Sequence, residues 1–180
     1  MRIISGQFKG RKLYAPTDDR VRPTTDRTRE ALFNILGGEI VDSWVLDAFA
    51  GVGTVGIEAL SRGAIGCDFI ELDKGALSYL KRNLKRIGDS FETRIFNQPV
   101  AKFVENWNES DSPYELVFAD PPYNIPPDSV AGLLRPTVGG LLVLETASQG
   151  KKLGGESFPD YELKDVRDYG RARLYFLKPL

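Results

Sequence analysis

The stretch that decides the fold is Val45-Leu46-Asp47-Ala48-Phe49-Ala50-Gly51-Val52-Gly53-Thr54-Val55-Gly56. Its first part is apolar enough for a buried strand, and the part from Gly53 or Thr54 onward is predicted to be a helix. The glycines at 51, 53 and 56 match the spacing G-x-G-x-x-G, which permits a tight turn, close approach of a ligand to the backbone and close packing of helix on strand. A strand, a glycine-rich loop and a helix in this order predict a nucleotide-binding α/β unit.

An acidic residue completes this type of site when it follows about 20 positions later, because its carboxylate accepts hydrogen bonds from ribose hydroxyls. Glu71 closes the next apolar run and lies 18 residues after Gly53 (71 − 53). We therefore expect a cofactor that contains adenosine. Asp47 indicates which one, because a carboxylate is unfavourable beside a pyrophosphate but suits the ammonium group of S-adenosylmethionine. The alternative is that Asp47 only ties down the glycine loop.

A second motif, Asp120-Pro121-Pro122-Tyr123, follows the apolar run of residues 116–119. This run predicts a buried strand that ends in a rigid loop, because two consecutive prolines restrict the backbone and supply no N–H donor. The carboxylate of Asp120 and the neighbouring carbonyls then form a group of acceptors, with the ring of Tyr123 beside them. Such a group suits a flat base with an exocyclic amine. The alternative is an ordinary turn, because Asp-Pro and Pro-Pro are common in loops.

Both motifs occur together with distinctive sequences at residues 2–6, 10–13 and 22–34. In this combination the chain resembles the class I S-adenosylmethionine-dependent methyltransferases, and within them the RsmD-type family. Members of that family methylate the exocyclic N2 of one guanine in bacterial 16S ribosomal RNA. The resemblance implies the same activity here. It also implies an α/β fold with a doubly wound, mostly parallel, seven-stranded sheet whose last strand is antiparallel.

The resemblance further implies which residues contact each ligand. The methionine part of the cofactor is expected to lie against Asp47, Ala50, Gly51 and Gly53. The ribose is expected at Glu71, and the adenine beside Leu72 and Asp73. The catalytic pocket for the target base would be formed by Asp120, Pro121, Pro122 and Tyr123. The chain departs from the family after the third strand, so the adenine amine would have to meet Asn97 or Gln98, and the sequence does not decide between them.

The composition restricts the chemistry. The 180 residues contain no histidine and one cysteine, Cys67. A Ser-His-Asp relay, a Cys-His pair and a histidine-ligated metal are therefore impossible, and we expect no metal centre. Methyl transfer tolerates this composition, because a sulfonium donor is already activated and mainly has to be aligned. The lone cysteine, the lack of a recognisable signal peptide and the lack of any apolar run near ~20 residues lead us to expect a soluble, cytoplasmic protein without a membrane partner.

Charge is distributed unevenly. Residues 1–36 contain eight Lys or Arg against four Asp or Glu, whereas the remainder contains 16 against 21. We expect residues 1–38 to form a basic, RNA-contacting extension, made of a glycine-rich hairpin and a helix that begins near residues 23–26. Residues 39–180 would form the cofactor-binding catalytic domain. The candidate RNA contacts are Arg11, Lys12, Arg22, Arg27 and Arg29, with a solvated surface as the alternative.

Other segments have simpler interpretations. Lys81, Arg82, Lys85 and Arg86 are predicted to form the solvated face of a helix that packs through Leu77, Leu80 and Leu84. Residues 161–167 and 172–178 are predicted to be a closing antiparallel pair. Glu145 follows an apolar run and could line the site at the end of its strand.

Three other functions compete with guanine methylation. A DNA adenine-N6 methyltransferase would use the same Asp-Pro-Pro-Tyr loop, but no segment is long enough for a separate DNA-recognition domain. A nicotinamide-dependent oxidoreductase would use the same glycine loop, but Asp47 and the double proline argue against it. A non-catalytic RNA-binding module has no need of intact glycines, Glu71 and Asp120. We therefore expect 16S ribosomal RNA as the partner, within an assembled or assembling small ribosomal subunit that presents a base flipped from its stack.

Overall fold

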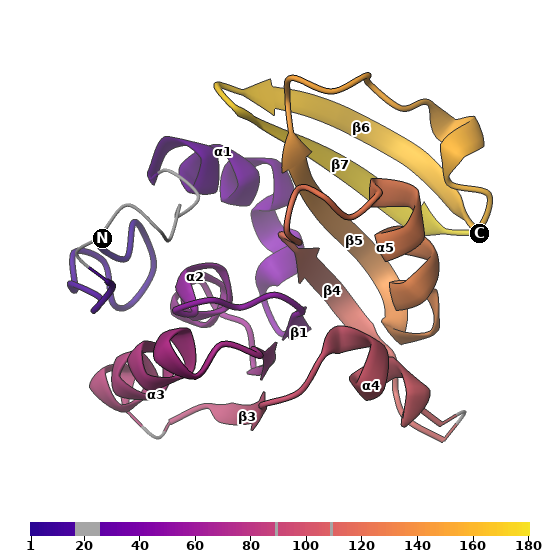
Figure 1. Cartoon of the computed structure of the whole chain (residues 1–180). Helices are drawn as coiled ribbons and strands as arrows, with labels where there is room; N and C mark the ends of the chain where they lie inside the picture. The colour runs from indigo at the N-terminus through magenta and orange to yellow at the C-terminus, as the bar shows by residue number, and fades with distance from the viewer. Residues whose placement is uncertain (17–25, 89, 109) are drawn as a thin grey trace.

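The computed structural model describes residues 1–16, 26–88, 90–108 and 110–180. These residues form a seven-stranded sheet with helices on both faces (Figure 1). The strands are β1 (Trp44–Asp47), β2 (Gly66–Ile70), β3 (Glu92–Phe96), β4 (Tyr114–Ala119), β5 (Val138–Ala147), β6 (Tyr161–Tyr169) and β7 (Ala172–Pro179). Their order is β3-β2-β1-β4-β5-β7-β6. Neighbouring strands from β3 to β5 are parallel, and β7 is antiparallel to both β5 and β6, so the predicted fold class is confirmed.

The centre of the sheet determines where a ligand can bind. β1 lies between β2 and β4, with Asp47 paired to Phe69 on one side and Phe118 on the other. The chain moves outward to β2 and β3, then returns across β1 to β4 and β5. The connections on either side of β1 therefore run in opposite directions, which leaves a crevice at the carboxyl ends of β1 and β4. Asp47 and Asp120 both lie at this edge of the sheet.

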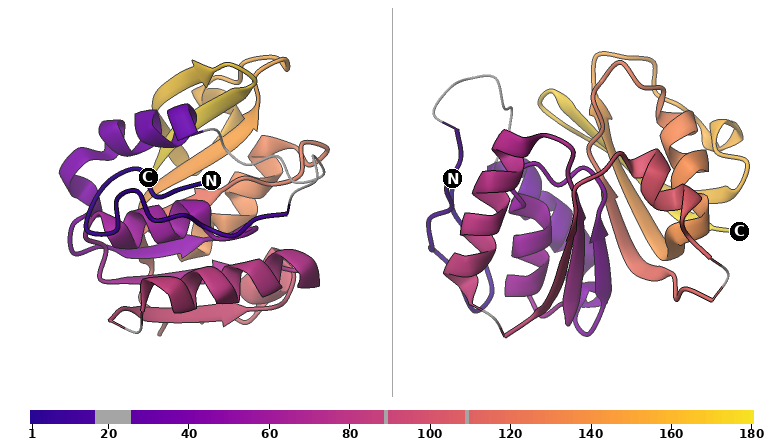
Figure 2. Two further views of the ribbon diagram at one scale, coloured as in Figure 1. Left: turned by 90° about the vertical axis from the view of Figure 1, so that its left-hand side faces the viewer. Right: turned by 60° about the horizontal axis from the view of Figure 1, so that its bottom comes forward.

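The helices cover the two faces of the sheet unequally (Figure 2, right). α1 (Asp26–Leu36), α2 (Thr54–Ser61) and α3 (Lys74–Ile87) bury their apolar residues in the core on one face. α4 (Val100–Glu105) and α5 (Pro127–Leu134) cover the other face. Three short 3-10 helices, Gly37–Ile40, Arg135–Thr137 and Gly155–Ser157, connect these elements. No helix within the described ranges is both long and apolar enough to cross a membrane.

Helix α3 follows the predicted pattern. Asp73 caps its start by accepting a hydrogen bond from the backbone N–H of Ala76 at 2.7 Å, as N-cap residues do. Leu77, Leu80 and Leu84 recur at helical spacing and are buried, as predicted. Their burial turns the basic face of the helix, with Lys81, Arg82, Lys85 and Arg86, to the outside, where all four are exposed.

The N-terminal segment, residues 1–16, lies against α2 and α3 (Figure 1). It contains one antiparallel bridge, Arg2 to Lys12, so it is less regular than the expected hairpin. One reason is that part of its backbone donors bond to α2 instead of to the opposite side of the hairpin. The N–H groups of Ile4 and Ser5 donate to the carboxylate of Glu58 at 2.8 and 2.9 Å. The expected start of the first helix at residues 23–25 lies outside the described residues, and α1 is described from Asp26.

Candidate cofactor and substrate pocket

A cavity of about 1160 Å³ opens at the carboxyl ends of the central strands. Most residues predicted for the two ligand sites line it, which places both sequence motifs in one space. These residues are Asp47, Ala50, Gly51, Glu71, Leu72, Asp73, Gln98, Asp120, Pro121, Pro122 and Tyr123. A cavity of this size is large enough for a nucleoside cofactor together with a second flat ligand.

The glycine loop joins β1 to α2, and its three glycines have different surroundings. Gly51 has φ +56°, and a Cβ there would meet nothing within 4 Å, so its backbone is open to a ligand. Gly53 is the N-cap residue that precedes α2, with φ +84°, and a Cβ there would lie 2.4 Å from the side chain of Leu80. A Cβ on Gly56 would lie 2.4 Å from the ring of Phe69. Gly51 thus faces the cavity, whereas Gly53, which was expected at the cofactor, packs toward α3 and is not among the residues that line the cavity.

Asp47 both ties down the loop and lines the cavity. Its Oδ2 accepts a hydrogen bond from the backbone N–H of Gly56 at 2.9 Å, as the simpler interpretation of this residue requires. The side chain is nevertheless buried at the wall of the cavity. The pKa of Asp47 is raised to about 7, chiefly by burial and in smaller part by the negative charge of Glu71, while the hydrogen bond from Gly56 opposes both. A carboxylate in this state is stabilised in its ionised form by a cation placed next to it.

Glu71 is oriented by backbone donors on both sides. Its Oε2 accepts from the N–H of Gly51 and its Oε1 from the N–H of Asp73, each at 2.6 Å. Each carboxylate oxygen has a further acceptor position, so a pair of ribose hydroxyls can still donate to Glu71. The glycine loop and the turn after β2 are therefore held in register by this one side chain.

Asn97 and Gln98, the two candidates for the adenine amine, are placed differently with respect to the cavity. The side-chain amide of Asn97 donates to the backbone carbonyls of Glu71 at 2.7 Å and Leu72 at 3.2 Å. Asn97 thereby fixes the turn after β2, and among the residues that line the cavity only Gln98 of the pair is found. Leu72 lines the cavity and is 62% exposed, which is the setting of an apolar residue available to a flat ring.

Two acidic residues lie side by side at the end of the cavity formed by β4 and β5. Asp120 follows β4, and the pairing of Ala119 with Leu144 places Glu145 at the adjacent position of β5. Glu145 lines the cavity and is only 8% exposed, in agreement with its predicted position. Burial, followed by the charges of Glu145 and Asp47, raises the pKa of Asp120 to about 8. This end of the cavity therefore favours ligands that donate hydrogen bonds or carry positive charge.

Sequence reasoning did not find most of the apolar residues of the wall, and three examples are Leu32 of α1, Val143 of β5 and Leu174 of β7. They come from three segments that are distant in the chain. Each reads as an ordinary core residue in its own helix or strand, so no local signal marks it as part of a site. Leu174 pairs with Glu145 in the sheet and Val143 lies two residues before Glu145 on β5, so this apolar part of the wall lies beside the Glu145 carboxylate.

One predicted RNA contact is wrong. Arg29 is fully buried, although it lies in the basic extension. Its guanidinium group donates to the carbonyl of Arg2 at 2.6 Å and to Asp26 at 2.9 Å, and its Nε lies 3.7 Å from the carboxylate of Glu58. Arg29 therefore joins α1, α2 and the N-terminal segment instead of contacting a ligand.

The other predicted RNA contacts are differently placed. Arg11, Lys12 and Arg27 are exposed. Arg22 lies outside the described residues. The exposed three can reach a polyanion from the side of the molecule that carries the N-terminal segment.

Known proteins share this sequence and fold. The family model described as conserved hypothetical protein 95 matches residues 1–178. Ribosomal RNA small subunit methyltransferase D of Escherichia coli (strain K12) is 42% identical over 138 residues, which is 77% of this chain and 65% of that protein. The protein of the same name from Haemophilus influenzae is 42% identical over 125 residues, 69% of this chain and 64% of that one. The matched part thus spans slightly less than two thirds of either relative.

Two solved structures resemble the whole chain. The yhhF protein of Escherichia coli has a TM-score of 0.81 and 31% identity, covering 99% of this chain and 97% of that one. A hypothetical protein of Thermus thermophilus has a TM-score of 0.81 and 30% identity, covering 99% of each chain. The likeness extends over the N-terminal segment, the sheet and the closing hairpin.

Proposed function

The chain belongs to the family described as conserved hypothetical protein 95, the RsmD-type family, and from this premise we propose that it is an S-adenosylmethionine-dependent methyltransferase. Its substrate is the exocyclic N2 of a guanine in 16S ribosomal RNA. The observation that carries the proposal is the shared cavity that joins the glycine loop to the Asp120 loop. One end has the groups that a nucleoside cofactor requires, and the other has the acceptors that a base amine requires.

The residues at the first end fit S-adenosylmethionine. The buried carboxylate of Asp47 would hold the ammonium group, Glu71 the ribose hydroxyls, and Leu72 and Gln98 the adenine. Gly51 leaves its backbone open to the methionine part. When bound, S-adenosylmethionine supplies a methyl group activated by a sulfonium sulfur. A dinucleotide would bring a pyrophosphate close to Asp47, which argues against an oxidoreductase.

The residues at the second end suit a guanine. Its N1–H and N2 amine present three adjacent donors, and Asp120 and Glu145 are acceptors when ionised. A hydrogen bond from the amine to Asp120 favours a pyramidal nitrogen and stabilises the positive charge that develops there. Because a cation nearby lowers the raised pKa of Asp120, the carboxylate is ionised in the loaded enzyme and can accept the amine proton. Pro121 and Pro122 keep competing donors away, and Tyr123 can stack on the base.

The partner we propose is 16S ribosomal RNA in an assembled or assembling small ribosomal subunit, in the cytoplasm. Methyltransferases of the small-subunit ribosomal RNA are named among the relatives at 42% identity. The basic extension, residues 1–38, would contact the RNA through Arg11, Lys12 and Arg27. A target base would have to leave its stack to reach the cavity.

The test uses tritiated S-adenosylmethionine and three acceptors: small subunits from a strain that lacks the enzyme, naked 16S RNA, and duplex DNA. Nucleoside analysis identifies the product, and Asp120→Ala serves as the inactive control. We expect label in N2-methylguanosine. Label in N6-methyladenine of DNA would refute the substrate while keeping the cofactor, and no label in any acceptor would refute the activity.

A further inference from the structure

A cluster of arginines and aromatic rings joins the N-terminal segment to the outer face of α3. We propose that Arg11, Tyr14, Arg82 and Arg86, together called the arginine–tyrosine surface, bind the sugar–phosphate backbone of the substrate RNA. This inference rests on the proposed function. It also extends the RNA-binding region from the N-terminal extension onto α3, whose basic face was expected to be only solvated.

Tyr14 is the centre of the cluster. The guanidinium carbon of Arg82 lies 4.1 Å from the centre of its ring, and that of Arg86 lies 5.3 Å from it. Arg86 also donates a hydrogen bond to the Tyr14 hydroxyl at 3.0 Å. Stacking on an aromatic face orients a guanidinium group while leaving most of its N–H donors available. The two arginines are four residues apart on one helix, so they lie on the same side of it.

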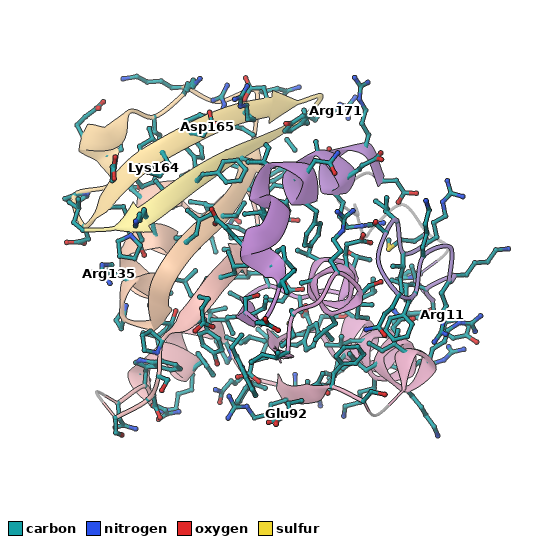
Figure 3. All side chains as sticks on the ribbon, turned by 180° about the vertical axis from the view of Figure 1, so that it is seen from behind. Arg11, Glu92, Arg135, Lys164, Asp165 and Arg171 are labelled. Atoms are coloured by element: carbon teal, nitrogen blue, oxygen red, sulfur yellow. The ribbon has the colours of Figure 1, made fainter. Side chains whose placement is uncertain are left out.

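Arg11 adds a third guanidinium group from the N-terminal segment. It stacks on Phe8 at 4.6 Å and donates to the backbone carbonyl of Arg86 at 2.7 Å. Figure 3 shows Arg11 on one side of the molecule and Lys164 of β6 on the other. No ion pair within the described parts of the chain involves Arg11, Arg82 or Arg86. Three oriented positive charges that no described carboxylate pairs call for an anionic partner.

The surface is held rigidly by Asn83, which is fully buried. Its side-chain oxygen accepts from the backbone N–H of Tyr14 at 2.7 Å, and its amide donates to the Tyr14 carbonyl at 2.9 Å. The same amide donates to the carbonyl of Val52 in the glycine loop at 2.9 Å. Tyr14 is thus fixed both to α3 and to the loop that lines the cavity. A purely solvated face would have no need of such a fixed aromatic residue between its arginines.

The position and the chemistry both suit RNA. Helix α3 begins at Lys74, which lines the cavity. At the α-helical rise, Arg82 lies about 12 Å and Arg86 about 18 Å further along the axis. Lys74 follows Asp73 at the cofactor end of the cavity, so an RNA strand whose target base lies at Asp120 would meet this face beyond the cofactor end. Arginine is suited to phosphate because its planar fork donates two parallel hydrogen bonds, and the partly exposed ring of Tyr14 offers an edge to a neighbouring sugar or base.

The experiment compares the double variant Arg82→Ala/Arg86→Ala with wild type and with a matched control, Lys164→Ala/Lys178→Ala, which removes the same charge from the β6–β7 hairpin. Binding to naked 16S RNA and to small subunits is measured by filter retention between about 50 and 200 mM salt. Each lost phosphate contact should make the slope of log affinity against log salt shallower by about 0.7 to 0.9. We expect a change of about 1.5 for the double variant, an affinity loss on the order of tenfold, and no change for the control.

Two further readouts separate the possible failures. The melting temperature should fall by no more than a few degrees, because the variant loses only the exposed contacts of the two arginines with Tyr14. S-adenosylmethionine affinity should equal that of wild type, because neither arginine lines the cavity. An unchanged salt slope on naked RNA would overturn the proposed surface, and so would a loss confined to assembled subunits, which would indicate a protein contact. The proposed function is judged independently, by whether the wild type methylates RNA.

Discussion

The buried carboxylate of Asp47 should make the protein less stable as the pH rises, and Asp47→Asn should remove this effect. The pKa of Asp47 is raised from an ordinary 3.8 to about 7 in the folded protein. Between these values the folded state binds a proton that the unfolded state has lost. The free energy of unfolding therefore falls with rising pH across this window and levels off above about pH 8.

The size of the effect follows from the same shift. Asparagine can still accept the bond from the N–H of Gly56 but carries no charge. At about 1.4 kcal/mol per pKa unit, the full shift of about three units corresponds to ~4 kcal/mol at most. Between pH 5.5 and pH 8.5 the effect develops over the interval from pH 5.5 up to the pKa of about 7, which is about 1.5 pH units. This interval corresponds to a loss of ~2 kcal/mol in the free energy of unfolding. Asp47→Asn should thus gain stability relative to wild type by about that amount on going from the lower to the higher pH.

Urea unfolding of wild type and Asp47→Asn at pH 5.5 and 8.5 measures this difference, with the exposed Asp128→Asn of α5 as the control. Calorimetric titration should show that the variant loses S-adenosylmethionine binding by at least about 30-fold, because removing one partner of a buried charge pair costs roughly 2–5 kcal/mol. An equal stability difference at the two pH values would refute the reasoning. It would mean that the pKa of Asp47 is not raised in the folded protein, and that the carboxylate is therefore not prepared for a cation.

Three further changes test other parts of the structure. Arg29→Met should lower the free energy of unfolding by about 3–5 kcal/mol, because it leaves the buried carboxylate of Glu58 with one cation fewer; urea unfolding measures it, and the salt slope of RNA binding should not change. Asn83→Ala should weaken S-adenosylmethionine binding on the order of tenfold, because the Val52 carbonyl loses its donor at a cost of about 1–3 kcal/mol; calorimetry would contradict this if the affinity were unchanged. In wild type the methyl-transfer rate should rise with pH, up to about pH 8, as the carboxyl of Asp120 loses its proton, and Asp120→Asn should abolish this rise. The variant should keep cofactor affinity within about threefold. Profiles of rate and of binding across pH measure both effects.

Much of the fold could be predicted because its signals are local. Each signal lies within a short stretch of sequence. Examples are the apolar runs of β1 and β4, the glycine loop, and the helical spacing of Leu77, Leu80 and Leu84. The carboxylates at the strand ends could also be placed together, because the carboxyl ends of parallel strands share one edge of a sheet. The number of strands and the antiparallel last strand came from family resemblance, since periodicity does not report which strands pair.

Arg27 and Arg29 show where charge patterns mislead. Both occur in the same basic stretch, yet one is exposed and the other fully buried. Arg29 pairs with Asp26 three residues away, but its buried partner is Glu58, which is 29 residues away in sequence (58 − 29), so no local rule identifies this second pair. A weaker signal was present: Arg29 precedes Leu32 and Phe33 by three and four residues, so it falls on the apolar side of α1.

The sequence predicts Asp47, Glu71 and Asp120 at the site, and all three line one cavity. Gly53 and Asn97, which are expected at the cofactor, do not line this cavity: a Cβ on Gly53 would meet Leu80, and Asn97 donates to the carbonyls of Glu71 and Leu72. Asn83 escaped notice because its three hydrogen bonds go to Tyr14 and Val52, whose distances from it in the chain are 69 and 31 residues. Asn83 bonds to backbone groups, and because every residue has a backbone, the sequence does not indicate which residues it contacts.

The two ligands require opposite charges: the cavity has to be acidic for its cofactor and base, whereas the RNA phosphates require a basic surface. Asp47, Glu71, Asp120 and Glu145 line one cavity, and their negative field favours a cationic cofactor and a donor-rich base. The same field repels the phosphates that accompany any base in RNA. Attraction for the backbone must therefore come from residues displaced from the cavity, and exposed arginines on the N-terminal segment and α3 are displaced in this way. The formal net charge of −1 conceals this separation, and raising the salt concentration should weaken RNA binding far more than cofactor binding, because the exposed charges are screened and the buried ones are not.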